Sequence, residues 1–244
     1  MIDIFIKSYP NDFKLLYYAL MSIDKNVTGY NNIHLVLPVG SNELFNPPVV
    51  PKNLIIHWVQ EDGNGYLFQQ YCKMTAFNYS DAEYILFSDS DCIFDKPIDI
   101  STQINNGKPE ILYTHYDKVG GGIIWQEPTE RFVGRHVEYE FMRRNCLTYH
   151  RSTLVNIANQ YPSLKEIVLG ADRFSEFNAI GAWAYINEHD KYTFTNTDNW
   201  EYTDPIAIQL WSYFDKNGSD THKYEYKRAI DAINKALDLN LNEL

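Results

Sequence analysis

The most informative stretch of this chain is Tyr84-Ile85-Leu86-Phe87-Ser88-Asp89-Ser90-Asp91-Cys92-Ile93-Phe94. Its apolar start predicts a short buried strand, and two aspartates separated by one residue follow the carboxyl end of that strand. Ligands of open parallel sheets bind outside the carboxyl ends of the strands. Two carboxylates held this close repel each other unless a cation lies between them, and hard oxygen ligands suit Mg²⁺ or Mn²⁺. Asp89 and Asp91 are therefore predicted metal ligands; the alternative is a strand-end turn with two solvated acids.

The chain before this stretch alternates strands and helices. Strands are predicted at residues 2–9, 33–39 and 54–59, and helices at residues 11–23 and 66–79. A loop is predicted at residues 41–53, which carry three prolines. Alternation of this kind, with apolar strands, indicates an α/β fold with a Rossmann-like, mostly parallel central sheet flanked by helices.

The second half of the sequence is less regular and predicts a mixed arrangement. The expected elements are strands at 111–115 and 123–125, a strand and then a helix within 147–161, and a helix at 223–239. The strand at 123–125 is expected to follow a flexible segment, Gly120-Gly121-Gly122. Because no internal repeat or linker demands a boundary, we predict a single domain over residues 1–244.

The charge of the chain limits the kinds of partner it can have. The 244 residues hold 21 Lys and Arg against 32 Asp and Glu, so the formal charge is 21 − 32 = −11. This surplus argues against a nucleic-acid binder and against adhesion to anionic membrane. Residues 81–99 hold six acids and one lysine. We therefore expect that a phosphate-bearing ligand binds here only with a divalent cation.

The start of the chain and its cysteines predict a cytoplasmic protein. No basic segment followed by an apolar run opens the sequence, so no signal peptide is expected. No stretch approaches the roughly 18 apolar residues that cross a bilayer. The three cysteines, Cys72, Cys92 and Cys146, have neither zinc-site spacing nor the pattern of a disulfide framework.

With its Asp-Ser-Asp motif after an apolar strand, the sequence resembles the GT-A class of nucleotide-sugar glycosyltransferases. More narrowly, it is similar to small bacterial and viral GT-A-like proteins, including chlorovirus rhamnosyltransferase-type domains. The resemblance spans residues 2–214 and rests on Ile6-Lys7-Ser8-Tyr9, Gly65 to Lys73, Phe87 to Asp91, Phe174 to Asn178 and Gln209-Leu210-Trp211-Ser212. It implies a GT-A-like single domain, with a nucleotide-binding half (about 1–95) and an acceptor half (about 96–244).

The same resemblance implies the ligands. Asp89 and Asp91 would hold Mn²⁺ or Mg²⁺ with the diphosphate of a nucleotide diphosphate sugar, most simply a UDP- or GDP-sugar, and Ser90 would lie at the same ligand. The acceptor would be a glycan. The leading hypothesis is therefore a divalent-metal-dependent, hexosyltransferase-type glycosyltransferase.

Two further segments are candidates for nucleotide-sugar binding. Ser8 and Tyr9 end the first strand, where Tyr9 would stack on the nucleobase and Ser8 would hydrogen-bond the nucleoside; the alternative is a plain strand-to-helix turn. Gln69, Gln70 and Lys73 share one face of a helix that begins behind glycines, as their spacing of three and four residues indicates. That face can contact nucleotide or phosphate; the alternative is a solvated polar face.

The catalytic candidates are Glu176 and its neighbour Asp172. Glu176 lies between aromatics in Phe174-Ser175-Glu176-Phe177-Asn178, where its pKa can be raised as a general base requires. Such a base favours an inverting reaction, whereas a retaining one needs none; the alternative is a surface acid or a partner of Arg173. Arg143, and with it Arg144, can neutralise a diphosphate or an acidic acceptor, or can be an ordinary ion-pair residue.

Histidines and tryptophans give weaker signals. His150, His189 and His222 are each possible metal ligands, but no spacing singles one out, and a structural role is the simpler reading. Trp125 and Trp200 are the best candidates for stacking on a sugar, against core packing for the other tryptophans. Two other functions stay open at this point: a haloacid-dehalogenase-type phosphatase, which also places Asp-x-Asp after a strand, and a non-catalytic carbohydrate-binding or structural module.

Overall fold

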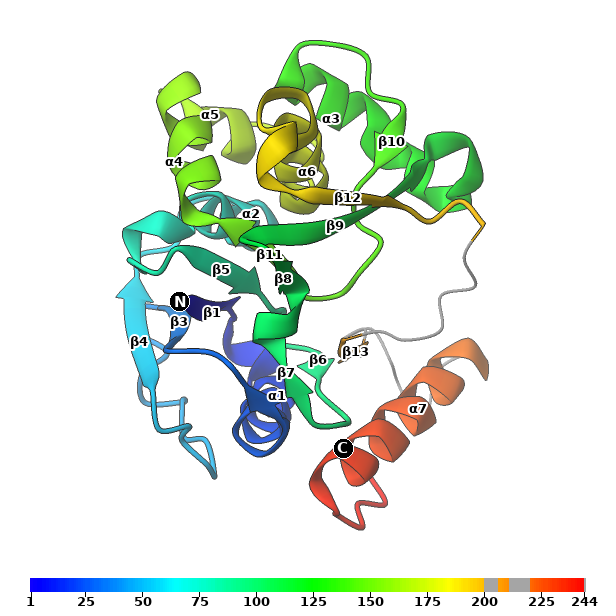
Figure 1. Cartoon of the computed structure of the whole chain (residues 1–244). Coiled ribbons are helices and arrows are strands. Elements are labelled where there is room, and N and C mark those ends of the chain that lie inside the picture. Colours follow the sequence, from blue (N-terminus) through cyan, green and yellow to red (C-terminus); the bar gives the residue numbers. More distant parts are fainter. Residues whose placement is uncertain (200–205, 211–219, 244) are drawn as a thin grey trace.

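A five-stranded sheet forms the centre of the protein (Figure 1). The computed structural model describes residues 1–199, 206–210 and 220–243. The strands lie in the order β11-β5-β1-β3-β4, with the bounds β1 Ile2–Lys7, β3 Ile33–Pro38, β4 Leu54–Val59, β5 Tyr84–Phe87 and β11 Leu147–His150. β1 pairs in parallel with β3 and β5, β3 pairs in parallel with β4, and β11 is the antiparallel edge. The mostly parallel α/β fold predicted from the sequence is thus confirmed.

The two faces of this sheet are covered by different helices. β1 is buried on both faces, which explains its continuous apolar pattern. Ile4 and Ile6 pack on the face covered by α1 (Phe13–Asn26), and Phe5 packs on the opposite face. That face is covered by α2 (Gly65–Met74), α4 (Arg151–Gln160) and α6 (Glu176–Asn187). The last helix, α7 (Asp220–Leu237), packs on α1 (Figure 1).

A second, smaller sheet belongs to the other half of the chain. Its central strand β9 (Lys108–His115) pairs in parallel with β12 (Thr193–Asn196) and antiparallel with β10 (Tyr139–Glu140) and β8 (Ile104–Asn105). The remaining short elements are β2 Val27–Thr28, β6 Cys92–Ile93, β7 Ile98–Asp99, β13 Ile208–Gln209, α3 Gln126–Val133 and α5 Leu164–Leu169. None of the helices in the described ranges combines the length and the apolar character needed to cross a membrane.

The structure corrects one predicted element and adds others. Residues 120–125 form a 3-10 turn that leads into α3, and not a strand. The reason is local, because Ile123 and Ile124 are exposed and have no strand to pair with. α2 ends at Met74, four residues before a short turn closes at Asn78, so the helix predicted for 66–79 is too long. Helices α5 and α6 were not predicted. Trp200 and residues 211–214 of the GT-A resemblance lie outside the described residues.

Candidate active site at the carboxyl end of the sheet

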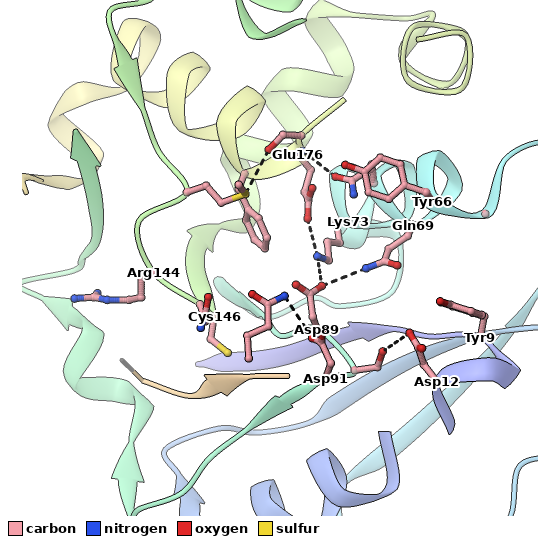
Figure 2. A pocket seen from close by; sticks show the side chains of 18 of the residues that line it. Tyr9, Asp12, Tyr66, Gln69, Lys73, Asp89, Asp91, Arg144, Cys146 and Glu176 are labelled. Atoms are coloured by element: carbon pink, nitrogen blue, oxygen red, sulfur yellow. Dashed lines mark hydrogen bonds and ion pairs between the residues drawn. The ribbon is translucent and has the colours of Figure 1, made fainter. Parts of the chain in front are cut away.

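A pocket of about 700 Å³ opens beyond the carboxyl ends of β1, β4 and β5 (Figure 2). The segments that meet there are turns that follow the strands, one face of α2, the start of α6 and the loop at residues 142–146 before β11. The side chains that line it are Tyr9, Asp12, Glu61, Gly65, Tyr66, Gln69, Gln70, Lys73, Asp89, Ser90, Asp91, Trp125, Met142, Arg143, Arg144, Asn145, Cys146, Ser175, Glu176, Phe177 and Gln209. Parallel α/β sheets bind their ligands at this position.

Asp89 and Asp91 lie on a turn that the sheet holds firmly. The pairing of β5 with β1 continues one residue past the strand, since the Ser88 amide donates to the Phe5 carbonyl at 3.0 Å. The Leu210 amide then donates to the Asp91 carbonyl at 2.8 Å, which ties the turn to β13. Burial raises the pKa of the Asp91 carboxyl well above its usual range, and the charges of Asp89 and Asp12 raise it further. The turn therefore presents negative charge that a bound cation would stabilise.

Lys73 is the cation inside the protein that faces these acids. Its ammonium donates to Asp89 Oδ1 at 2.5 Å and to Glu176 Oε1 at 2.6 Å, and lies 4.4 Å from the centre of the Phe177 ring (Figure 2). The side chain is only 1% exposed. Burial alone would lower the pKa of Lys73, but the carboxylates of Asp89 and Glu176 outweigh it and raise the pKa. Lys73 is thus permanently charged and links the two acids.

The local sequence explains why Lys73 points there. Asn64 caps α2, and its side-chain oxygen accepts hydrogen bonds from the amides of Tyr66 and Leu67 at 2.9 and 3.4 Å. The helix then places Gln69 and Lys73 one turn apart on the same side. Both reach Asp89, with Gln69 Nε2 donating to Oδ1 at 3.2 Å. The shared face predicted from the spacing is therefore observed, and it faces the pocket rather than open solvent.

Glu176 is the first residue of α6 and lies on the other side of Lys73 from Asp89. Ser175 caps the helix by accepting from the Asn178 amide at 3.3 Å, and the Glu176 amide donates to Gln70 Oε1 at 3.0 Å. The side chain is buried. Burial raises the pKa of Glu176, and the charge of Asp89 adds to the increase, although the bond from Lys73 opposes it. A buried carboxylate of raised basicity at a pocket wall is a candidate general base.

The other predicted site residues divide into those that line the pocket and those that do not. Tyr9, Gln69, Gln70, Ser90 and Arg143 line it together with Lys73, Asp89, Asp91 and Glu176. Ser8 is fully buried and does not line the pocket, and among the described residues its hydroxyl has no hydrogen-bond partner. Asp172 is exposed and is not a lining residue.

Only some of the weaker candidates line the pocket. Arg143 and Arg144 line the pocket, but each also pairs with an acid, Glu140 and Glu110 respectively. His150 and His189 do not line the pocket, whereas Trp125 does. The side chain of His222 and the whole of Trp200 are outside the described residues. Of the six acids in residues 81–99, only Asp89 and Asp91 line the pocket.

Two acids of the pocket were not identified from the sequence. Asp12 Oδ2 accepts from the Ser90 hydroxyl at 3.4 Å, and burial raises the pKa of Asp12. Glu61 Oε1 accepts from the buried ammonium of Lys7 at 2.7 Å. Asp12 and Glu61 follow β1 and β4, so both lie past the carboxyl ends of parallel strands. The rule that singled out Asp89 would have found them.

The donor groups present fit a hard divalent cation. Asp89, Asp91 and Cys92 can each offer a ligand atom, and these atoms lie within 4.8 Å of one another. The two carboxylates are the hard oxygens that Mg²⁺ and Mn²⁺ prefer, and Asp12 adds a third carboxylate to the pocket. When bound, such an ion supplies Lewis-acid stabilisation of an anionic leaving group.

Comparison with known proteins places the fold. A crystal structure of the galactosyltransferase LgtC, in complex with donor and acceptor sugar analogues, matches with a TM-score of 0.61 and 12% sequence identity. The match covers 98% of this chain and 98% of that one. No family model and no curated protein sequence matches this chain. The expected GT-A-like fold is therefore confirmed, while the narrower likeness to small bacterial and viral proteins stays a prediction.

Proposed function

We propose that this protein is a glycosyltransferase that moves a sugar from a nucleoside diphosphate sugar to a hydroxyl acceptor, with a divalent metal ion at Asp89 and Asp91. The observation that carries the proposal is the chain Asp89–Lys73–Glu176 along one wall of the pocket, with links of 2.5 and 2.6 Å. It places a candidate metal ligand and a candidate base on opposite sides of one buried cation. The full-length match to a galactosyltransferase supports the same reading.

The acids after the strands define the donor end of the pocket. Mn²⁺ or Mg²⁺ held by Asp89 and Asp91 would stabilise the departing diphosphate as a Lewis acid. Gln69 orients the Asp89 carboxylate, and Arg143 adds positive charge to the wall. Tyr9 would then meet the nucleoside, since it follows β1 in the same pocket.

Glu176 has the properties of the base that activates the acceptor. Lys73 keeps the carboxylate ionised, while burial and Asp89 raise its pKa towards the value of an effective base. As the acceptor hydroxyl attacks the anomeric carbon, Glu176 takes its proton and the nucleoside diphosphate leaves from the other side. This geometry gives inversion at the anomeric carbon. The acceptor, a glycan, would enter past Trp125 and Asn145, which also line the pocket.

A thermal-shift panel of UDP-, GDP- and dTDP-sugars, with and without Mn²⁺, tests the donor class. Binding to the native state alone raises the free energy of unfolding by about 2.7 kcal/mol at a ligand concentration of about 100 Kd. We expect a rise in melting temperature with at least one UDP- or GDP-sugar, and only when Mn²⁺ is present.

Two variants from the same acidic segment test whether the thermal shift depends on the predicted metal ligand. Asp91→Asn should abolish the Mn²⁺-dependent shift, because it removes a predicted metal ligand. Asp81→Asn is the matched control, since Asp81 is fully exposed and does not line the pocket. A flat panel with the unmodified protein, or an equal loss in both variants, would contradict the proposed function.

A further inference from the structure

β4 is an edge strand whose outer side is open. It ends the order β11-β5-β1-β3-β4, and in the described part of the chain its only neighbouring strand is β3 (Figure 1). None of its residues is buried, and Ile55 and Trp58 are each 40% exposed, whereas β3 is buried along nearly its whole length. An apolar strand in this position is a template for pairing with another strand.

Alternate residues of β4 direct their backbone amides and carbonyls away from the sheet. At the two ends of the pairing, the carbonyls of Asn53 and Val59 accept from the first residue of β3 and from the residue that follows it, at 2.9 and 2.8 Å. Odd-numbered residues therefore bond to β3, and Leu54, Ile56 and Trp58 face outward. The Leu54 amide is used by the carbonyl three residues earlier, at 3.1 Å. The amides of Ile56 and Trp58 point to the open side.

The surface around this edge is apolar, although the chain as a whole is acidic. Val39, Leu44 and Val50 are each more than half exposed, and they lie between β3 and β4. Trp58 packs edge-on against Phe45 of the same connection, with ring centres 6.5 Å apart. β4 itself contains no Asp, Glu, Lys or Arg. Two copies can therefore pair through β4 without opposing like charges, which the net charge of −11 makes costly elsewhere.

The charges that flank β4 favour an antiparallel arrangement of two copies. Lys52 precedes the strand and is exposed, and the acids Glu61 and Asp62 follow it. In the described part of the chain, each acid pairs with a lysine of its own chain through one oxygen only. Antiparallel pairing brings Lys52 of one copy to the acidic end of the other, whereas parallel pairing would bring lysine to lysine. Charge complementarity therefore selects the antiparallel arrangement.

We propose that two copies of this chain associate through β4, as antiparallel neighbours related by a two-fold axis at Ile56, so that their central sheets form one continuous sheet. In this register the amide and carbonyl of Ile56 bond to those of Ile56 in the other copy. The Trp58 amide donates to the Leu54 carbonyl of the other copy, and the axis repeats the bond. The Leu54 amide, which the chain already uses, is the outward amide that this arrangement does not need.

Sedimentation equilibrium over the micromolar range tests the association. We expect the mass of the unmodified protein to approach 57 kDa, which is 2 × 28.5 kDa. Trp58→Lys places a charge on the edge strand and should raise the dissociation constant by about tenfold or more. Ile167→Lys is the matched control, because Ile167 is 38% exposed but lies on α5, and it should leave the dissociation constant unchanged. Circular dichroism confirms that both variants are folded.

Ile56→Cys reports on the register. Across the axis the two Cα atoms at position 56 are about 5.5 Å apart, within the roughly 4.4–6.8 Å that a disulfide spans. Oxidised glutathione should therefore link two Ile56→Cys chains, with release of two molecules of reduced glutathione. Ile55→Cys is the matched control on the same strand, since its two copies lie about 8 Å apart, too far for a disulfide. The native cysteines are buried and do not link chains.

The outcomes decide between a second copy and any other partner of this edge. A mass of 28.5 kDa at every concentration overturns the proposal. A dimer that Trp58→Lys does not weaken also overturns it, and so does one that Ile55→Cys links as readily as Ile56→Cys. None of the substituted residues lines the pocket, and neither measurement uses donor or acceptor. The result is therefore independent of the proposed function.

Discussion

Each end of the central sheet carries a cluster of charged residues. The two clusters differ in how completely their polar atoms are paired within the protein. At the amino end, Asp3 of β1 is 2% exposed and hydrogen-bonds to the strand residue His34 and to the loop residues Asn32 and Ser80. At the carboxyl end, Asp89 and Glu176 share one buried ammonium, that of Lys73, and Asp91 lies beside Asp89. The first cluster stabilises the fold, whereas the second leaves negative charge facing a pocket.

In the amino-end cluster, both carboxylate oxygens of Asp3 and both ring nitrogens of His34 have a partner. Asp3 Oδ1 accepts from the Asn32 amide at 3.0 Å, and Oδ2 bonds to His34 Nε2 at 2.9 Å and to the Ser80 hydroxyl at 2.5 Å. His34 Nδ1 is in turn 3.0 Å from His57 Nε2. Burial would raise the pKa of Asp3, but the hydrogen bonds from His34, Ser80 and Asn32 outweigh it and lower the pKa. The network therefore favours the ionised form of the Asp3 carboxylate.

The carboxyl-end cluster lacks that balance. Asp89 and Glu176 share one ammonium, and the pKa values of Asp91 and Glu176 are both raised, by burial first and then by neighbouring acids. The Ser8 hydroxyl is left without a partner at the same end. Where a fold retains buried groups that it does not satisfy, a ligand is the natural partner. The difference between the two ends therefore predicts which substitutions affect function and which affect stability.

The largest expected effect is that of Glu176→Gln on sugar transfer. Loss of a general base costs about 10²–10⁴-fold in rate, so release of nucleoside diphosphate in the presence of acceptor should fall by that factor. Donor binding, followed by the Mn²⁺-dependent thermal shift, should be retained because the carboxylate is not a predicted metal ligand. Glu127→Gln is the control, since Glu127 is 80% exposed and forms a surface pair with Arg131. Full activity in Glu176→Gln would remove this residue from its proposed role.

Lys73→Met should give the largest loss of stability. It leaves the Asp89 and Glu176 carboxylates buried without their cation, and breaking a buried pair in this way costs roughly 3–5 kcal/mol. Urea unfolding at pH 7.5 measures it. Lys25→Met is the control, because its partner Asp238 is exposed and surface pairs contribute about 0–1 kcal/mol.

A second substitution shows whether charge is the cause of that loss. The double variant Lys73→Met/Glu176→Gln should recover at least about 1 kcal/mol of the lost free energy of unfolding, because one of the two unpaired charges is gone. Additive losses in the double variant would mean that Lys73 stabilises the protein by packing on Phe177 and not by its charge.

The sequence predicted the strands of the sheet and the position of its acids, since both depend on local patterns. Apolar runs followed by a turn locate β1, β3, β4 and β5 closely. The carboxyl-end rule locates Asp89 and Asp91 in a pocket. Spacing on a helix also placed Gln69 and Lys73 on one face, as α2 has them.

What the sequence did not predict depends on long-range contacts. The bond between Lys73 and Glu176 joins residues 103 positions apart, and only the packing of α2 against α6 brings them together. α6 itself was missed because it is apolar nearly all round, so it has no helical stripe to detect. At residues 120–125 an element was predicted that does not form. Their apolar run suggested a strand, but it lies on the surface.

The two ends should respond to acid with opposite signs. Burial, and then the neighbouring His34, lower the pKa of His57. His57 therefore contributes stability above its unfolded pKa of about 6.5, which is lost as the pH falls through the folded value. The raised pKa of Glu176 contributes stability at low pH that is lost as the pH rises through that pKa.

Urea midpoints between pH 7.5 and pH 5.5 measure these slopes. Compared with the unmodified protein, His57→Gln should lose less stability on acidification, by up to about 1 kcal/mol. Glu176→Gln should lose more. If His57→Gln and the unmodified protein had the same slope, the amino-end cluster would not be the acid-sensitive one.

The smallest loss of stability is expected for Ser8→Ala, and it is measured against Ser80→Ala at the other end of the sheet. Ser80→Ala removes a donor to the buried Asp3 carboxylate, and a hydrogen bond to a charged group contributes about 1.5–3 kcal/mol. Ser8→Ala removes a fully buried hydroxyl that bonds nothing in the described part of the chain, so its cost in unfolding free energy should be within about 0.5 kcal/mol of zero. The sequence predicts that the Ser8 hydroxyl hydrogen-bonds the nucleoside. If it does, Ser8→Ala should reduce the rise in melting temperature that the nucleotide causes in the presence of Mn²⁺. Equal stability losses in the two variants would show that both ends of the sheet are built for stability alone.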